Sequence, residues 1–402
     1  MNKNIKLAVA GAVLALSASA SAGIIIPAGE WTMDINGNVN AFANITKGKG
    51  TNTTAAAVGG LATASQTHED QAQGINTGLL PAWLGFTGTT RQNDTDVSFT
   101  ISMQPNVSDN FSHGDAKTPL NRQAFVTFGD KSWGSIKLGK DIGIFASDAI
   151  LNDMTLLGVG AGAATSGAAT TLGGIGTGYI YAVWKGQIAY TTPNFNGFQA
   201  TVGITNPNQG QGVIAAASFG ATDTVLNQDR FGLEGKASYA FSGDAASGKI
   251  WVSGASYDVT YATTGASYTA TVMDIGATVN AGNLGLTGYY YSGEGVGTTV
   301  FGNLAHDGSG NKRDSDGGYL QATYVLPTKT KVGLAYGTSN LDRATTTDTT
   351  VINKNERITL GLYHPLTKHL NLVAEYNDVE SRVHNGNKGE STTGSLGAIL
   401  FF

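Results

Sequence analysis

Apolar and polar residues alternate along many short stretches of the chain, with a period of two residues. Between residues 32 and 45, apolar side chains share one face of an extended strand, and Asn36, Asn38, Asn40 and Asn44 share the other. Comparable stretches begin near residues 97, 231, 273, 320 and 358, with no long amphipathic helical pattern between them. The alternation predicts an all-β protein whose strands each have one apolar and one polar face.

Short and long connections take turns between these strands. The eight long stretches lie near residues 46–76, 105–119, 140–184, 207–228, 263–270, 293–316, 341–355 and 382–390. The seven short turns lie near residues 92–95, 130–134, 193–197, 242–248, 281–283, 327–330 and 365–369. Together they join sixteen strands. An even strand number, with short turns at one end and long loops at the other, is typical of a transmembrane antiparallel β-barrel.

The charged residues on the polar faces separate this fold from a soluble β-sandwich, which also alternates. A sandwich would bury these charges in its core at a high cost in free energy. A barrel of about sixteen strands encloses water, which can solvate them. The polar faces therefore predict an aqueous lumen lined by charged residues, which include Asp34, Arg122, Arg230, Glu234, Lys236, Asp274, Arg357 and Glu375.

The last strand ends on Phe402, with Leu396, Ala398 and Leu400 on the same face. An apolar face that ends on an aromatic residue suits the closing strand of an outer-membrane barrel. We therefore interpret Phe402 as the barrel-closure signal for the barrel-assembly machinery. Further aromatic residues are predicted to form girdles in contact with lipid: Trp133, Phe195, Phe198, Phe241 and Tyr363 on the turn side, and Tyr179, Tyr181, Trp184, Tyr257 and Tyr290 on the loop side.

Residues 1–22 have the three parts of a cleaved secretory signal peptide. Lys3 and Lys6 precede a short apolar run, and small residues end the segment at Ala22. Residues 23–402 would then form the mature barrel.

The net charge of −5 would become −7, because two lysines and no acids are removed. This acidity argues against a nucleic-acid partner, and the absence of cysteine excludes disulfides. The signal peptide and the barrel pattern together predict an outer-membrane location in a Gram-negative bacterium.

Three stretches resemble motifs of the Gram-negative general porins. Trp83-Leu-Gly-Phe-Thr-Gly88 is similar to the second-strand pattern of that family. The hairpin from Asn121 to Lys140 and the stretch from Ile188 to Phe198 resemble the hairpins on either side of its constriction loop. The resemblance implies a homotrimer of sixteen-stranded barrels that passes small hydrophilic solutes and ions by diffusion. It also implies that the loop at about 140–184 folds into the barrel and narrows it.

The chain departs from the family pattern at the predicted constriction. Trp83 replaces the usual arginine of the second strand, Lys140 replaces another, and the loop lacks the Pro-Glu-Phe-Gly run of enterobacterial members. A basic wall of Arg91, Arg122 and Lys137 could still face a loop with three aspartates and orient dipolar solutes. Ordinary solvated charges are the alternative. The predicted pore-lining and constriction residues are Arg91, Arg122, Lys137, Lys140, Asp141, Asp148, Asp153, Arg230, Glu234, Lys236 and Arg357.

A passive outer-membrane channel is the leading hypothesis for function. A substrate-specific channel using Tyr179, Tyr181 and Trp184, or a non-conducting structural or adhesive barrel, remains an alternative. No histidine and serine stand in a nucleophile motif, and no HExxH motif is present, so we predict no enzyme activity. The acidic stretches 307–311 and 314–317 lack the bidentate acid of a calcium loop. We therefore predict no metal and no cofactor.

Overall fold

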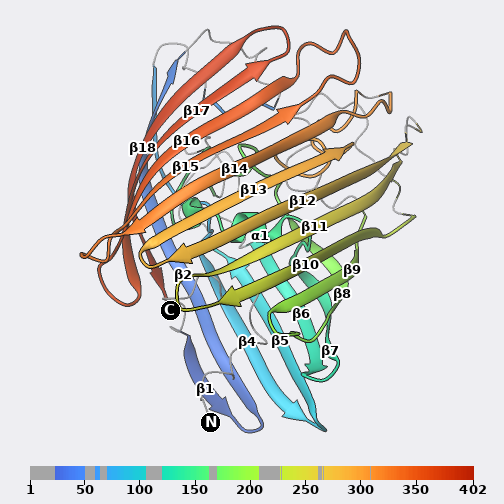
Figure 1. The fold of residues 1–402 in the computed structure, drawn as a ribbon, viewed down its shortest axis with the longest axis vertical. Helices are drawn as coiled ribbons and strands as arrows, with labels where there is room; N and C mark the ends of the chain where they lie inside the picture. Colours follow the sequence, from blue (N-terminus) through green and yellow to red (C-terminus); the bar gives the residue numbers. More distant parts are fainter. Residues whose placement is uncertain are drawn as a thin grey trace.

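The computed structural model describes residues 23–402, apart from 50–58, 64–69, 106–119, 163–169, 208–226, 228, 261–264, 266 and 308. The signal peptide predicted at residues 1–22 lies outside the described residues. Within them, no helix combines the length and apolarity needed to cross a membrane. Eighteen antiparallel strands form one continuous sheet that winds into a barrel (Figure 1).

The strands of the first half are separated by connections of very different length. They are β1 (Ile24–Ala28), β2 (Trp31–Lys49), β3 (Gln71–Asn76), β4 (Trp83–Gln92), β5 (Thr95–Gln104), β6 (Leu120–Asp130), β7 (Gly134–Ile142), β8 (Trp184–Thr191) and β9 (Phe198–Thr205). The strands of the second half are longer on average. They are β10 (Gly232–Ser242), β11 (Ser247–Thr260), β12 (Ser267–Ala281), β13 (Leu284–Glu294), β14 (Asp314–Val325), β15 (Lys331–Leu341), β16 (Ile352–Pro365), β17 (Leu370–Val383) and β18 (Lys388–Phe401).

The long strand β2 closes the barrel. Its first part pairs with β4 over Thr32–Asn38, and its later part pairs with β18 over Asn38–Lys49. The short strands β1 and β3 pair only with β2. Without these two, sixteen strands form a closed antiparallel ring, which confirms the predicted fold class and strand number. Because the ring is closed, its strands leave no unpaired edge in the membrane.

All seven predicted short turns join consecutive strands of the ring. In the turn between β4 and β5, Asn93 and Asp94 have φ values of 48° and 60°. Two consecutive residues with positive φ define the type I′ turn, whose twist fits an antiparallel hairpin and which favours Asn and Asp. Local turn chemistry therefore agrees with the strand pattern at this end of the barrel.

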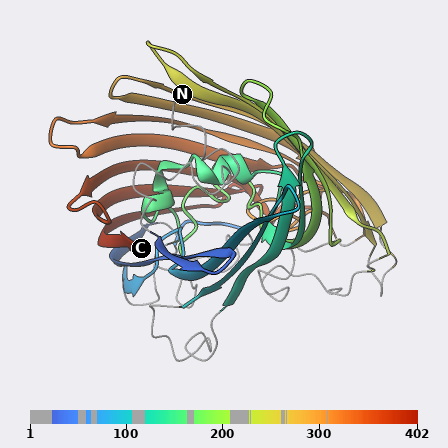
Figure 2. The ribbon, with the colours of Figure 1, turned by 90° about the horizontal axis from the view of Figure 1, so that it is seen from below.

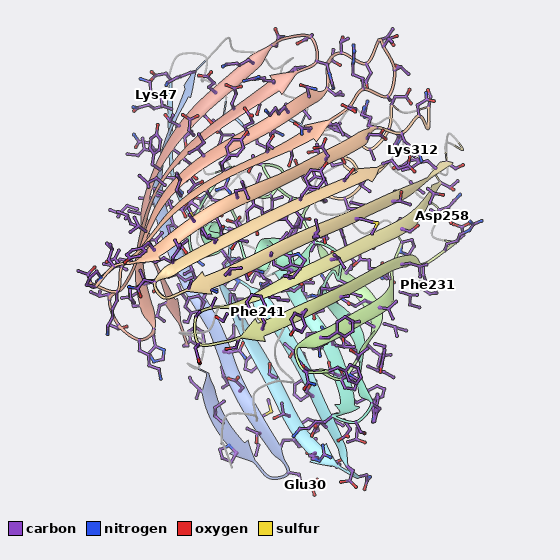
Figure 3. The ribbon with its side chains drawn as sticks, viewed as in Figure 1. Glu30, Lys47, Phe231, Phe241, Asp258 and Lys312 are labelled. Atoms are coloured by element: carbon purple, nitrogen blue, oxygen red, sulfur yellow. The ribbon has the colours of Figure 1, made fainter. Side chains whose placement is uncertain are left out.

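The two faces of the strands separate as the alternation predicts. On β2, Val39 is 54% exposed, whereas Asn38, Asn40 and Asn44 are buried inside. On β18, Leu396 and Leu400 face outwards, and Ser395 is buried on the opposite face. Figure 3 shows Phe231 and Phe241 near opposite ends of β10, where the interfacial aromatic girdles of a barrel are expected.

Several aromatic residues assigned to the girdles do not lie there, which corrects the prediction. Tyr363 and Tyr257 point inwards and are 2% exposed, because their neighbours in sequence occupy the outward positions of the pleat. Tyr179 belongs to the segment between β7 and β8 and is fully buried. Tyr290 is half exposed on the outer face, as predicted.

The segment between β7 and β8 lies within the barrel. It contains the short helix α1 (Ser147–Leu151) and a 3-10 helix (Met154–Leu157), and Figure 2 shows it in green, enclosed by the strands. We call residues 143–183 the inner loop; of these, 163–169 are outside the described residues. Two further segments, near residues 77–82 and 296–305, also contribute buried side chains such as Leu79 and Phe301.

Candidate functional site

A carboxylate on β10 holds the beginning of the inner loop. Glu234 accepts hydrogen bonds from the backbone N–H groups of Ile144 and Phe145, over 2.6 and 3.0 Å. Its other oxygen receives Lys185 Nζ at 2.6 Å and the Tyr257 hydroxyl at 2.7 Å. The carboxylate is buried, and these four donors compensate for its lost hydration. Glu234 was predicted to line the pore, but here it anchors the loop.

A second carboxylate, on β17, holds the middle of the inner loop in the same way. Glu375 accepts hydrogen bonds from the N–H groups of Val159 and Gly160, over 2.9 and 2.8 Å. The Tyr363 hydroxyl donates to it over 2.7 Å. A side chain on residue 158 would also collide with this carboxylate, which explains the glycine found there.

Neutral side chains of the wall complete the attachment. Ser253 accepts from the N–H of Ala146 at 3.2 Å, and Ser339 accepts from the N–H of Gly178 at 3.0 Å. Gln321 accepts from the N–H of Met154 at 2.9 Å and donates to the carbonyl of Asn152 at 2.7 Å. Strands β10, β11, β14, β15 and β17 therefore hold the inner loop through its backbone.

Asp153 accepts hydrogen bonds from other residues of the inner loop. Its carboxylate caps the 3-10 helix by accepting from the N–H of Thr155 at 2.9 Å, and it also accepts from the N–H of Gly174 at 2.9 Å. The Tyr179 hydroxyl donates to it over 2.8 Å, and burial beside this carboxylate raises the pKa of Tyr179 well above its usual value. Arg357 Nη2 lies 4.0 Å away. Asp153, within the loop, and Arg357, on the wall beneath it, thus have almost no exposed surface.

Asp148 of α1 lies between two lysines of the wall. Lys236 Nζ is 3.0 Å from one carboxylate oxygen, and Lys249 Nζ contacts the other. Burial acts to raise the pKa of Asp148, but the two ammonium groups outweigh it, and the pKa is lowered overall. Asp148 therefore stays ionised between the two ammonium groups.

The opposite wall carries a polar chain across β5, β6 and β7. Ser102 donates to Gln123 at 2.9 Å, and Gln123 donates to Asp141 at 2.9 Å. Lys137 pairs with the other oxygen of Asp141 and lies 4.8 Å from the ring centre of Phe125. Lys137 of the predicted basic wall and Asp141 are therefore neighbours on one strand and do not face each other across the barrel.

Arg122 lies between two indole rings. Its guanidinium carbon is 4.6 Å from the ring centre of Trp83 and 4.3 Å from that of Trp184. Cation–π contacts of this kind favour a guanidinium in a partly dry site. Trp83, which replaces the arginine of the family pattern, therefore supports a neighbouring arginine instead.

Three of the predicted residues lie away from the inner loop. Arg91 pairs with Asp96 at 2.8 Å and Asp130 at 3.0 Å, beside the short turns. Arg230 precedes β10 at the long-loop end and pairs with Asp258. Lys140 lies on the opposite face of β7 from Lys137 and donates to the Asn121 carbonyl, so its predicted place in the lumen is wrong.

The structure adds functional positions that the sequence analysis did not select. Lys249 joins Lys236 at Asp148, and Lys185 joins Glu234. Both lysines share a strand face with buried inward residues, so parity along the strand would have found them. The described residues contain no group of three or more acidic, histidine or cysteine side chains arranged to hold a metal ion.

A family model described as Gram-negative porin matches residues 7–384. The chain belongs to this family. Porins are channels of the outer membrane, so this chain is an outer-membrane channel for the passive diffusion of solutes. Family membership implies a channel rather than an enzyme. The comparison with curated proteins gave no match.

Solved porin structures share the fold. The outer membrane channel DcaP of Acinetobacter baumannii has a TM-score of 0.68 at 15% identity, covering 94% of this chain and 99% of that one. The anion-selective porin from Comamonas acidovorans has a TM-score of 0.62 at 16% identity, covering 93% and 100%. OmpT of Vibrio cholerae in its trimer form has a TM-score of 0.55 at 12% identity, covering 92% and 99%.

Proposed function

We propose that this porin passes small hydrophilic solutes and ions through the part of the lumen that the inner loop leaves open. The carboxylates, serines and glutamine that hold the loop come from β10, β11, β14, β15 and β17. Solutes would then pass beside β4–β8, where polar side chains such as Thr87, Thr100 and Gln123 line the wall. The loop would act as the constriction.

The attachment of the loop supports a constriction of fixed width. Seven backbone N–H groups of the inner loop, from Ile144 to Gly178, donate to wall side chains. Each bond to a buried carboxylate contributes more than an ordinary hydrogen bond. A loop held at so many points should not open and close readily, so conductance should be steady.

A substrate-specific channel lined by aromatic residues receives less support. Tyr179 is fully buried within the inner loop, with its hydroxyl on Asp153. One face of the Trp184 ring contacts the Arg122 guanidinium. Of the three rings in this hypothesis, Tyr181 is partly exposed, so the described structure does not form the continuous aromatic path that the hypothesis needs.

Single-channel recording in a planar bilayer tests the proposed function. The purified, refolded protein should give stepwise, ohmic currents in concentrated KCl. A correctly folded barrel that gives no current would overturn the proposal in favour of a structural barrel. Heat-dependent gel mobility should confirm folding before the recording.

Assembly and export can be tested on the same preparation. We propose a homotrimer, in line with the trimeric form of the Vibrio cholerae protein, and a mature chain that begins at Gly23. A native gel should show a trimer that dissociates on heating, and N-terminal sequencing should read Gly-Ile-Ile-Ile. A monomer-sized band in mild detergent, or a retained Met1, would contradict these proposals.

A further inference from the structure

The ion pairs beside the open part of the lumen are unequally exposed. In the pair on β7, the Lys137 side chain is 29% exposed and Asp141 only 2%. At α1, Lys249 is 32% exposed and Lys236 17%, whereas the Asp148 carboxylate that they share is 6% exposed. In each case the lysine side chain is more exposed than the carboxylate that it pairs with.

Four other carboxylates of the interior, among the described residues, are buried as well. Glu234 lies beneath the inner loop, Asp153 is sealed within it, and Glu375 is covered by the loop backbone. Asp274 accepts from the Ser253 N–H and the Tyr289 hydroxyl. Each of these four charges is directed at donors of the protein, so little of it faces a passing ion. Asp34, on the inward face of β2, is only partly buried.

The exposed lysines lie on one region of the wall. Lys137, on β7, is linked through Ala189 and Gly203 to β10, the strand that carries Lys236. Lys249 follows on β11. With adjacent strands about 4.8 Å apart, the patch spans roughly 20 Å of the wall from β7 to β11. Between Lys137 and β10, the start of the inner loop lies against Gly203 and Glu234, so Lys137 stands on one side of this segment and Lys236 and Lys249 on the other.

A fourth lysine has no carboxylate at ion-pair distance among the described residues. Lys331 begins β15 and lies 5.0 Å from the ring centre of Tyr363, which faces the interior. Acidic residues are exposed at the short-turn rim, where Asp94 and Asp96 accompany Arg91. That rim is formed by β4 and β5, and the inner loop is anchored to other strands.

From this asymmetry we infer that the channel prefers anions, and that Lys137, Lys236 and Lys249 set the preference. The solutes favoured are small anions, such as chloride and carboxylates. The inference rests on the proposed function, because selectivity needs an open channel. An ion near a wall charge in water gains about 0.6 kcal/mol at 7 Å, which is roughly a threefold change in local concentration. The oppositely charged partner, buried behind the ammonium group, offsets only part of this gain.

Reversal potentials in a KCl gradient test the inference. The wild-type porin should reverse at a potential of the sign set by chloride. Lys137→Gln and Lys249→Gln should each lower the chloride-to-potassium permeability ratio by up to roughly sevenfold, because the local chloride concentration falls and the potassium concentration rises by about the same factor. Lys140→Gln is the matched control, because Lys140 lies on the same strand as Lys137 but on its other face. It should leave the ratio unchanged.

A further variant changes the selectivity in the opposite direction, so that misfolding of the lysine variants does not decide the test. Asp148→Asn keeps both lysines and removes their shared counter-charge, so it should raise the preference for chloride. A wild-type channel that prefers potassium, or equal changes in the Lys137 and Lys140 variants, would overturn the inference while leaving the channel itself established. No current at all from the folded wild-type protein would instead refute the proposed function.

Discussion

Charged residues have different roles in two regions of the barrel interior. Beside β14–β17, Arg357 and Glu375 lie under the inner loop and are almost completely buried. Lys137 on β7, and Lys249 on β11 beside α1 of the inner loop, have about a third of their side chains exposed. The buried charges fasten the loop, whereas the partly exposed lysines are in contact with water. Burial, rather than residue type, separates the structural charges from those that act on ions.

Glu375→Ala, on the side covered by the inner loop, is expected to cause the largest loss of stability. The change leaves the N–H groups of Val159 and Gly160 and the Tyr363 hydroxyl without an acceptor. We expect a loss of roughly 3 kcal/mol in unfolding free energy, from unsatisfied buried groups. Urea unfolding in detergent measures the loss, and single-channel recordings should show noisier current because the loop is less firmly held.

Glu375→Gln provides the control for that change. The amide keeps one acceptor oxygen and nearly the same volume, so it should retain a large part of the stability. If the alanine and glutamine variants are equally stable and equally quiet, Glu375 does not hold the loop, and the covered side is less rigid than its contacts indicate.

A smaller effect on the covered side is expected from Tyr179→Phe. The change removes one donor to Asp153 and keeps the ring packed against Tyr319 and Tyr289. The expected cost is about 1 kcal/mol, the typical value for one hydrogen bond. Thermal unfolding measures it, and the reversal potential should not change because Asp153 stays buried. A shift in selectivity would show that this carboxylate faces the ion path.

A pH series tests how the charge of Asp148 contributes to ion selectivity. The pKa of Asp148 is lowered by Lys236 and Lys249, so the carboxylate stays charged through its usual titration range. Its contribution to stability is complete above the unfolded pKa of about 3.9 and is lost as pH falls through the lower folded value. Reversal potentials should therefore be insensitive to Asp148 between pH 7 and about pH 4. Below this range, chloride preference should rise more in the wild type than in Asp148→Asn, because the other carboxylates of the channel titrate in both proteins.

The smallest effect is expected outside both regions. Lys388 is 46% exposed and pairs with Glu380 and Glu390 near a loop of the barrel. Exposed ion pairs of this kind contribute little to stability, because water and salt screen them. Lys388→Gln should change neither the unfolding transition nor the reversal potential. A measurable change in selectivity would place part of the ion filter at the barrel mouth.

The strands and their faces could be predicted because they depend on local pattern. The alternation around Val39 and Asn40 and the turn at Asn93 and Asp94 involve only neighbouring residues. Strand number followed from counting these elements, and closure followed from the need to satisfy every backbone group in lipid. The same parity argument places Tyr363 inside and Lys140 outside, in disagreement with the aromatic girdle and the family pattern.

The contacts of the inner loop could not be predicted in this way. Asp153 meets Gly174 and Tyr179, and Glu375 meets Val159 across 216 positions of sequence. These pairs depend on the path of the loop through the lumen, which no local period encodes. The exposure of Lys137 against Asp141 likewise depends on which wall the loop covers. Sequence supplied the charged residues, and only the fold divides them between anchoring and ion contact.

The wall holds the inner loop mainly through hydrogen bonds from the backbone N–H groups of the loop. Side chains at Ile144, Ala146, Met154 and Val159 take no part in the hydrogen bonds that fasten them, since their N–H groups are the donors. Mutation can therefore exchange many loop side chains without releasing the loop. The position of the loop inside the barrel is therefore compatible with many loop sequences, including one without the Pro-Glu-Phe-Gly run.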